Sequence, residues 1–241
     1  AVRLEPFKVC DMVRFMQLKA ILSKIIPNNT KIRFLSHLPK LEDWRLAHPE
    51  IYPTFSSRFD LYDYVSESIV KNEKIIYLEF GVFEGESIQY WSEINLAQES
   101  TFWGFDTFTG LPESWEFFSG KLEKYEFDTG GKIPEIKDKR VAFMKGLFQE
   151  TLSDFLANEA LGSLIVIHID ADIYSAALYV LTQMDHKIKP GTIIIFDEFS
   201  NVLHEFRALD DYCAAYMRAY EVLGVTHNQR DYFGQIAIRM L

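Results

Sequence analysis

The sequence predicts an α/β fold built on a doubly wound, mostly parallel sheet with helices on both faces. The stretches Leu164–Asp170 and Thr192–Asp197 are nearly continuous apolar runs, and a segment of helical character at 175–187 separates them. Strands that are apolar along their whole length are typical of parallel sheets covered on both sides. A third such run, at 75–80, again leads through a turn into an amphipathic segment, so the alternation of strand and helix recurs.

Composition excludes several classes of protein. The 241 residues are 48% hydrophobic and 15% aromatic, which suits a globular domain with a substantial core. The net charge of −10, from 25 basic and 35 acidic residues, argues against a nucleic-acid partner. Cys10 and Cys213 lack metal-ligand spacing, so neither a disulfide framework nor a zinc site is expected. Without an apolar leader or an 18-residue apolar span, we expect no membrane partner and a cytoplasmic location.

The chain is expected to consist of a helical and irregular extension, residues 1–57, followed by the main domain, residues 58–241. Apolar residues recur at roughly helical spacing from Phe7 to Ile26, and prolines then punctuate a looser segment. The first helix needs a partner: it would pack on the domain, cover an active site or join two subunits. Another helix is predicted to begin near Arg58.

A strand, a tight loop and a helix are predicted around two glycines. Gly81 and Gly85 permit a sharp turn and a close backbone approach to a ligand. Ser87, or Glu86 before it, is expected to cap the following helix, whose N-terminus suits an anionic or polar ligand group. The dinucleotide fingerprint G-x-G-x-x-G is absent, because Phe83 and Glu86 stand where it requires glycine.

A second strand is predicted at 101–106 and ends in a carboxylate. Asp106 lies 21 residues after Gly85, the spacing at which an acid binds ribose hydroxyls in nucleotide-binding α/β folds. The alternative is an Asp that merely caps a turn. Residues 107–139 form an aromatic insertion without clear periodicity, which indicates a lid or binding loop.

The remaining elements complete the predicted sheet. A strand is expected at 141–144, with a helix opening at Thr151 or Ser153. A helix over 204–223 and a terminal strand at 234–240 follow the two long apolar runs.

Carboxylates follow the strands at the edge where parallel strands end and ligands bind. They are Glu79, Asp106, Asp170, Asp172, Asp197 and Glu198. These carboxylates would repel one another, and hydrogen bonds from sugar hydroxyls together with a cationic ligand would offset part of that repulsion. A hard divalent ion held by Asp170, Asp197 and Glu198 would supply the rest, and oxygen ligands favour Mg²⁺ over zinc. The alternative is a set of separate loop caps spaced too far apart to share an ion.

Two histidines accompany these acids. His168 shares a strand face with Asp170, but a histidine inside a buried run is more often a hydrogen-bonded core residue than a base. His204, beyond the Asp197 strand end, is the freer of the two to reach a substrate.

Four segments together resemble the macrocin O-methyltransferase family, class I S-adenosylmethionine enzymes that methylate sugar hydroxyls on macrolide antibiotics. They are residues 79–87, 104–113, 168–175 and 190–199. The Gly-Phe-Asp-x-Phe-x-Gly-Leu-Pro-Glu and Ile-Asp-x-Asp-x-Tyr patterns are the more specific of these, whereas the glycine loop is shared by methyltransferases at large. The resemblance runs from about residue 58 to the C-terminus.

The resemblance implies a Rossmann-like class I methyltransferase fold that binds S-adenosyl-L-methionine at the glycine loop, with Asp106 on the ribose. Its cofactor contacts would come from Glu79, Gly81, Phe83, Gly85, Ser87, Asp106, Thr107 and Asp170. It also implies Mg²⁺ at Asp170, Asp197 and Glu198, although family members often carry Asp-Asp where this chain has Asp197-Glu198. A lysine base is not expected, because position 173 is Ile. Asp170 is then the candidate proton acceptor, with His204 or Asp172 as alternatives.

The expected acceptor is a hydroxyl of a sugar-containing or polyhydroxyl small molecule. In the family, the N-terminal part shapes the acceptor site and the subunit contacts, so a homo-oligomer is expected. Two other functions remain open at this point. A nicotinamide-dependent sugar oxidoreductase would use the same sheet, and a non-catalytic nucleoside-binding or assembly module would keep the loop without the chemistry.

Overall fold

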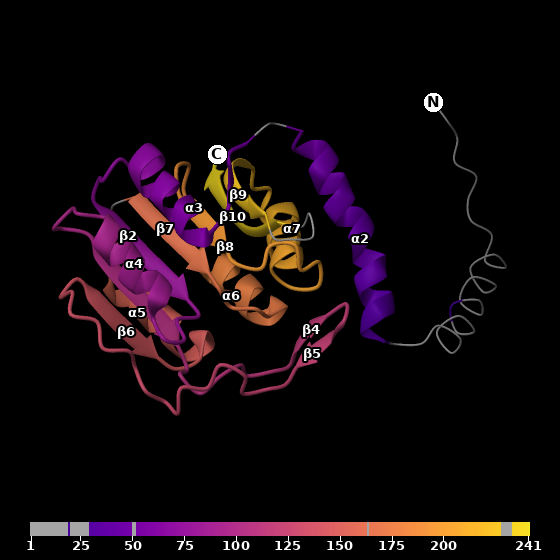
Figure 1. The fold of residues 1–241 in the computed structure, drawn as a ribbon, viewed down its shortest axis with the longest axis horizontal. Coiled ribbons are helices and arrows are strands. Elements are labelled where there is room, and N and C mark those ends of the chain that lie inside the picture. The colour runs from indigo at the N-terminus through magenta and orange to yellow at the C-terminus, as the bar shows by residue number, and fades with distance from the viewer. Residues whose placement is uncertain (1–18, 20–28, 50–51, 163, 228–232) are drawn as a thin grey trace.

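The computed structural model describes residue 19 and residues 29–49, 52–162, 164–227 and 233–241 (Figure 1). The apolar helix predicted between Phe7 and Ile26, together with Cys10, lies outside the described residues apart from Lys19. None of the described helices is long and apolar enough to cross a membrane.

The centre of the fold is a sheet of eight strands. Their order across the sheet is β1 (Thr54–Phe55), β9 (Tyr220–His227), β10 (Phe233–Met240), β8 (Ile193–Phe196), β7 (Leu164–Ile169), β2 (Ile75–Phe80), β3 (Thr101–Asp106) and β6 (Val141–Lys145). Strand β10 runs antiparallel to β8 and β9, and the remaining pairs are parallel. The mostly parallel sheet is therefore confirmed. The helix predicted over 204–223 ends at Tyr216, and β9 takes the residues that follow.

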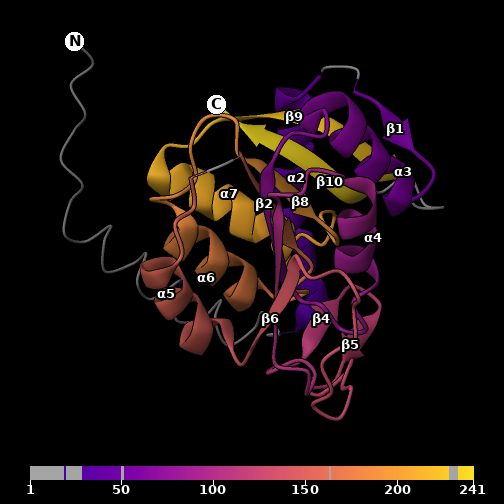
Figure 2. The same cartoon turned by 90° about the vertical axis from the view of Figure 1, so that its left-hand side faces the viewer.

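Helices cover both faces of this sheet (Figure 2). On one side lie α3 (Arg58–Tyr64), which continues as a π-helix (Val65–Val70), and α4 (Glu86–Ile94). On the other lie α5 (Phe148–Asn158), α6 (Tyr174–Met184) and α7 (Glu205–Tyr216). Each face has its own buried apolar core, and the doubly wound architecture is confirmed. Helix α5 begins before the predicted Thr151, because the Glu150 side chain supports its first turn by accepting a hydrogen bond from the backbone N–H of Leu147 at 3.2 Å.

Helix α2 (Thr30–Ala47) occupies part of the segment that was expected to be loose. Pro39 lies inside it and removes one helical hydrogen bond. The helix persists because Asn29 caps its first turn and its inner face packs on the domain. Trp44 is buried there, and its Nε1 donates to the Tyr220 hydroxyl at 2.7 Å. Tertiary packing overrides the local proline signal.

The insertion 107–139 includes a short hairpin formed by β4 (Trp115–Phe117) and β5 (Gly120–Leu122). This hairpin reaches helix α2 (Figure 1). The Phe34 and Phe118 rings are 5.4 Å apart, and Arg33 forms an ion pair with Glu116. Helix α2 of the extension therefore packs against the hairpin of the insertion.

Candidate active site

The glycine loop joins β2 to α4 beside the end of β7. Gly81 has a φ of +93°, and a Cβ there would lie 1.8 Å from the carbonyl oxygen of Asp170, so only glycine fits. Gly85, with a φ of +83°, is itself the N-cap of α4 and provides no side-chain cap. The expected cap by Ser87 or Glu86 is therefore wrong. Ser87 is buried within the first turn of α4.

Asp106 organises this loop from the neighbouring strand. Its Oδ2 accepts hydrogen bonds from the backbone N–H groups of Val82 and Phe83 at 2.7 and 2.9 Å, and its Oδ1 accepts from Phe108 at 2.7 Å. A carboxylate has about four acceptor positions, so roughly one remains for a ligand hydroxyl. The hydroxyl of Thr107 donates within the following turn, to the Gly110 carbonyl.

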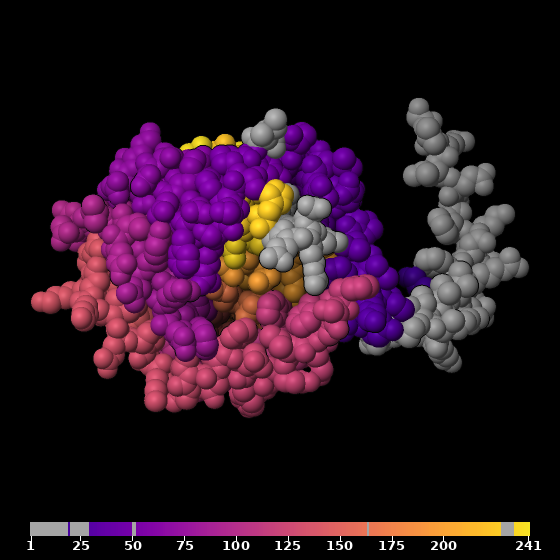
Figure 3. Space-filling model, in the orientation of Figure 1, coloured from indigo at the N-terminus to yellow at the C-terminus, as the bar shows by residue number. Residues whose placement is uncertain are grey.

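A cavity of about 370 Å³ opens beside these loops, within the size range of small-molecule sites. The space-filling view shows a hollow between the α3 and α4 side and the insertion (Figure 3). Of the candidate residues, those that line the cavity are Gly81, Phe83, Asp106, Thr107, Asp170, Asp172, Asp197 and Glu198. Those that do not line it are Glu79, Gly85, Ser87 and His204. Most of the strand-end acids therefore share one cavity with the glycine loop.

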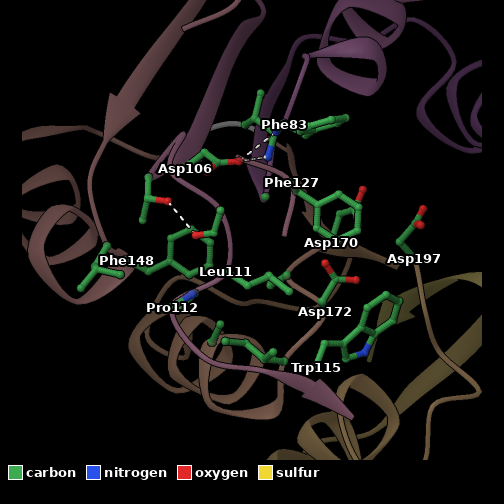
Figure 4. A pocket seen from close by; sticks show the side chains of 18 of the residues that line it. Phe83, Asp106, Leu111, Pro112, Trp115, Phe127, Phe148, Asp170, Asp172 and Asp197 are labelled. Atoms are coloured by element: carbon green, nitrogen blue, oxygen red, sulfur yellow. Dashed lines mark hydrogen bonds between the residues drawn. The ribbon is translucent and has the colours of Figure 1, made fainter. Parts of the chain in front are cut away.

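Aromatic and apolar side chains complete the walls, and most of them come from the insertion that the sequence indicated as a lid or binding loop. The insertion contributes Leu111, Pro112, Trp115 and Phe127, and the start of α5 contributes Phe148. Figure 4 shows Asp170, Asp172 and Asp197 near Trp115 at one end of the cavity, and Asp106 at the other. No described residue before Arg58 lines the cavity, and the described part of the extension contacts the insertion instead.

Burial and the charges of neighbouring carboxylates disfavour the ionised form of several of these acids. Burial, and then the charge of Asp197, raises the pKa of Asp170 well above its ordinary value. Burial, followed by the charges of Glu198 and Asp197, raises the pKa of Asp172 to about 8. Burial and the charge of Asp197 also raise the pKa of Glu198 to about 7. These shifts show that a cation beside the cluster would stabilise its ionised form.

A buried network lies behind the cluster. Tyr77 donates its hydroxyl hydrogen to Glu79 at 2.6 Å and lies 2.8 Å from Nδ1 of His168. The His168 ring stands between Glu79, at 3.4 Å, and Asp197, at 3.9 Å. Burial would lower the pKa of His168, but Asp197 and Glu79 raise it to about 10. Glu79, 1% exposed, thus faces an internal cation and not the cavity.

Part of the donor set fits a divalent ion. Within the described chain, carboxylate oxygens of Asp170 and Asp197 and a ring nitrogen of His168 all lie within 4.8 Å of one another. The Asp170 and Glu198 carboxylates accept no hydrogen bond from the described residues, which leaves their oxygens available. The group contains His168 where the sequence suggested Glu198. Because His168 is held as a cation, it acts as a counter-ion to Asp197 and is a poor ligand.

His204 is buried behind the hairpin and does not line the cavity. Its Nδ1 accepts from the backbone N–H of Tyr174 at 3.1 Å, and its Nε2 lies 2.8 Å from the carbonyl oxygen of Glu116. Both ring nitrogens are therefore occupied by backbone groups, and burial lowers the pKa of His204. These contacts fasten the hairpin to the sheet edge and leave no nitrogen for a substrate hydroxyl.

Glu205 is a buried carboxylate that sequence patterns did not single out. It is 0% exposed and begins α7. Its Oε1 accepts from the backbone N–H of Ala171 at 3.3 Å, and its Oε2 accepts from that of Glu198 at 2.9 Å. Its only sequence signal is an acid at a helix start, which occurs in most proteins.

Comparisons with known proteins agree with this geometry. Residues 56–222 match the macrocin O-methyltransferase (TylF) family. The O-methyltransferase NovP superposes with a TM-score of 0.56 at 20% identity, over 76% of this chain and 78% of its own. CalS11, a TDP-rhamnose 3'-O-methyltransferase of calicheamicin biosynthesis, does so with a TM-score of 0.53 at 17% identity, over 98% and 97%. An O-methyltransferase from Bacillus cereus, in complex with SAH, gives 0.50 at 14% identity, over 92% and 96%.

No curated protein matches the chain in sequence. The solved structures share less than 25% of their residues with this chain, so they establish the fold, the class I methyltransferase architecture. The family match extends from the helix before the glycine loop into β9, and therefore includes every candidate residue of the cavity. On this match the chain belongs to the TylF family of macrocin O-methyltransferases, which are S-adenosylmethionine-dependent O-methyltransferases.

Proposed function

We propose that this protein methylates a hydroxyl of a sugar-containing or polyhydroxyl small molecule, with a divalent ion at the strand ends. One observation carries the proposal: Asp170, Asp172, Asp197 and Glu198 line the same cavity as the glycine loop. The CalS11 structure supports an acceptor of this kind, since CalS11 is a TDP-rhamnose 3'-O-methyltransferase. The aromatic walls from the insertion suit the apolar faces of such a molecule.

Two groups that the chain does not itself supply are needed for this chemistry. When bound, S-adenosylmethionine supplies an electrophilic methyl group, and a hard divalent ion lowers the pKa of a nearby hydroxyl. We assign the ion to Asp170 and Asp197. Glu198 is the third ligand in this proposal, because it follows Asp197 directly, lines the cavity and accepts no hydrogen bond from the described residues. Mg²⁺ is the ion that such oxygen donors favour.

The protein's own residues position and deprotonate the acceptor. Gly81 keeps the loop backbone against the end of β7, so a methyl donor held by this loop would lie near the carboxylates. Asp170 is our candidate for the proton acceptor, because its carboxylate lines the cavity and accepts no hydrogen bond from the described residues, and burial raises its pKa well above the ordinary value. Asp172, which also lines the cavity, is the second candidate. His204 is left out of this role, since its nitrogens are bound to backbone groups.

Replacing Asp106 with Ala is expected to weaken S-adenosylmethionine binding roughly ten- to a hundredfold, since a charged acceptor typically contributes about 1.5–3 kcal/mol. The variant loses both the anchor of the loop N–H groups and the acceptor for a ribose hydroxyl. Calorimetric titration with S-adenosylmethionine and with a nicotinamide dinucleotide measures this.

The control is Asp154→Ala, an exposed acid on α5, which should bind like the wild type. Unaltered affinity in the Asp106 variant would remove Asp106 from the cofactor site. If the wild type bound the nicotinamide dinucleotide and ignored S-adenosylmethionine, the oxidoreductase alternative would replace the proposal.

A further inference from the structure

We infer that Glu205 is a positioning residue for methyl transfer: its buried carboxylate fixes the distance between the two strand-end loops that present Asp170 and Asp197. The inference rests on the proposed function and extends it to Glu205, which does not line the cavity.

Glu205 connects the loops that follow β7 and β8. Ala171 directly follows Asp170 at the end of β7, and Glu198 directly follows Asp197 at the end of β8. The sheet pairing reaches only to the N–H of Asp197, which bonds to the Ile169 carbonyl oxygen at 3.1 Å. One residue further on, the two loops are joined through the two oxygens of Glu205. A single side chain therefore bridges both loops where the ladder ends.

The loop after β7 contains a residue in an uncommon backbone conformation. Asp172 has a φ of +58°, in the left-handed region that residues with a Cβ seldom adopt. Glu205 binds the N–H one residue before Asp172, and His204 binds the N–H of Tyr174, two residues after it. Two consecutive residues at the start of α7 thus clamp the turn that aims Asp170 and Asp172 into the cavity.

Burial commits Glu205 to this bridge. The residue is 0% exposed, and both of its carboxylate oxygens accept from backbone N–H groups of the two loops. The position makes sense where the loops that carry Asp170 and Asp197 need a common support.

The test compares wild type, Glu205→Gln and Glu205→Ala. Gln can accept from one of the two N–H groups but turns its NH₂ toward the other, and Ala accepts from neither. Mn²⁺ affinity is measured by calorimetry without turnover, along with S-adenosylmethionine affinity, kcat and acceptor KM. Loss of a residue that orients metal ligands typically lowers metal affinity or activity 10–100-fold.

We expect Glu205→Gln to lose about 10–100-fold in Mn²⁺ affinity and in kcat, with cofactor affinity and acceptor KM within about twofold of wild type. Excess Mn²⁺ should restore part of the lost kcat, and Glu205→Ala should be more impaired. The matched control is Asp185→Asn. Its carboxylate, partly buried at the end of α6, accepts from Tyr212 and Arg218 far from the cavity. The Asp185→Asn substitution should lower the midpoint of thermal unfolding while kcat and Mn²⁺ affinity stay unchanged.

Wild-type values of kcat and Mn²⁺ affinity in Glu205→Gln would overturn the inference and leave the proposed function standing. Absence of both S-adenosylmethionine binding and transfer in the wild type would overturn the proposed function itself. If neither variant folds, amide hydrogen exchange of the wild type decides. The N–H groups of Ala171 and Glu198 should exchange at similar rates, and addition of Mn²⁺ should slow the exchange of both. Different exchange rates that Mn²⁺ does not change would overturn the inference that Glu205 bridges the two loops.

Discussion

Replacing Asp170 with Asn is expected to lower kcat by about 10²–10⁴-fold, the range that a positioned general base contributes. The Asn side chain has nearly the same shape but cannot take up the acceptor's proton, and it removes one negative charge from the cluster. S-adenosylmethionine should still bind, because the Gly81 and Asp106 contacts are untouched. Steady-state kinetics, together with calorimetry of the cofactor, separates the chemical step from binding.

Asp172→Asn is the informative companion, since Asp172 is the other candidate base in the same cavity. We expect a smaller loss of kcat there than in Asp170→Asn. A larger loss would transfer the base role to Asp172, and wild-type turnover in both variants would contradict proton transfer to either carboxylate.

Chelation of divalent ions is expected to lower turnover by about 10²–10⁴-fold, equivalent to several kcal/mol of lost charge stabilisation. Asp197→Asn should have a similar effect in the presence of Mg²⁺. An aliphatic hydroxyl is a very weak acid, and Arg58 is the one basic residue that lines the cavity within the described chain, already ion-paired with Glu86. EDTA treatment followed by titration with Mg²⁺ measures the dependence.

Recovery of activity on adding Mg²⁺ to the chelated wild type, and not to Asp197→Asn, is the expected pattern. Undiminished turnover in chelated buffer would return Asp170, Asp197 and Glu198 to the role of strand-end caps or direct bases. Binding of S-adenosylmethionine to the metal-free enzyme serves as the control for intact folding.

Most of the sheet could be predicted because buried parallel strands leave a direct trace in the sequence. The runs that became β2, β3, β7 and β8 are apolar on both faces, and no helix pattern competes with them. Strand β9 was missed because its first three residues are only partly buried and continue the helical pattern of α7 without a strong stop signal. Helix α2 was missed because Pro39 is a local signal, whereas the packing of Trp44 that outweighs it is tertiary.

The candidate site was predictable as far as chain topology determines it. Parallel strands bring their ends together, so acids directly after β3, β7 and β8 were expected at one edge, and they do line one cavity. Topology does not specify which way a side chain points. Glu79 lies on a strand next to the glycine loop, yet it turns inward to Tyr77 and His168.

The supporting contacts were beyond sequence patterns for a related reason. Glu205 and His204 bind the backbone N–H groups of Ala171 and Tyr174, 34 and 30 residues earlier in the chain, and such pairings have no characteristic spacing. His204 looked free to reach a substrate because its neighbours in sequence carry the strand-end acids. In the fold, the hairpin at Glu116 covers it instead.

The most direct test of the account is transfer of a labelled methyl group from S-adenosylmethionine to a panel of glycosylated and polyhydroxyl acceptors, with wild type and Asp170→Asn assayed side by side. The label is expected to appear as a methyl ether on an acceptor hydroxyl with the wild type and to fall by at least about a hundredfold with the variant. Equal labelling by both proteins, or label on nitrogen or carbon in place of oxygen, would contradict a hydroxyl methyltransferase that works through the strand-end carboxylates.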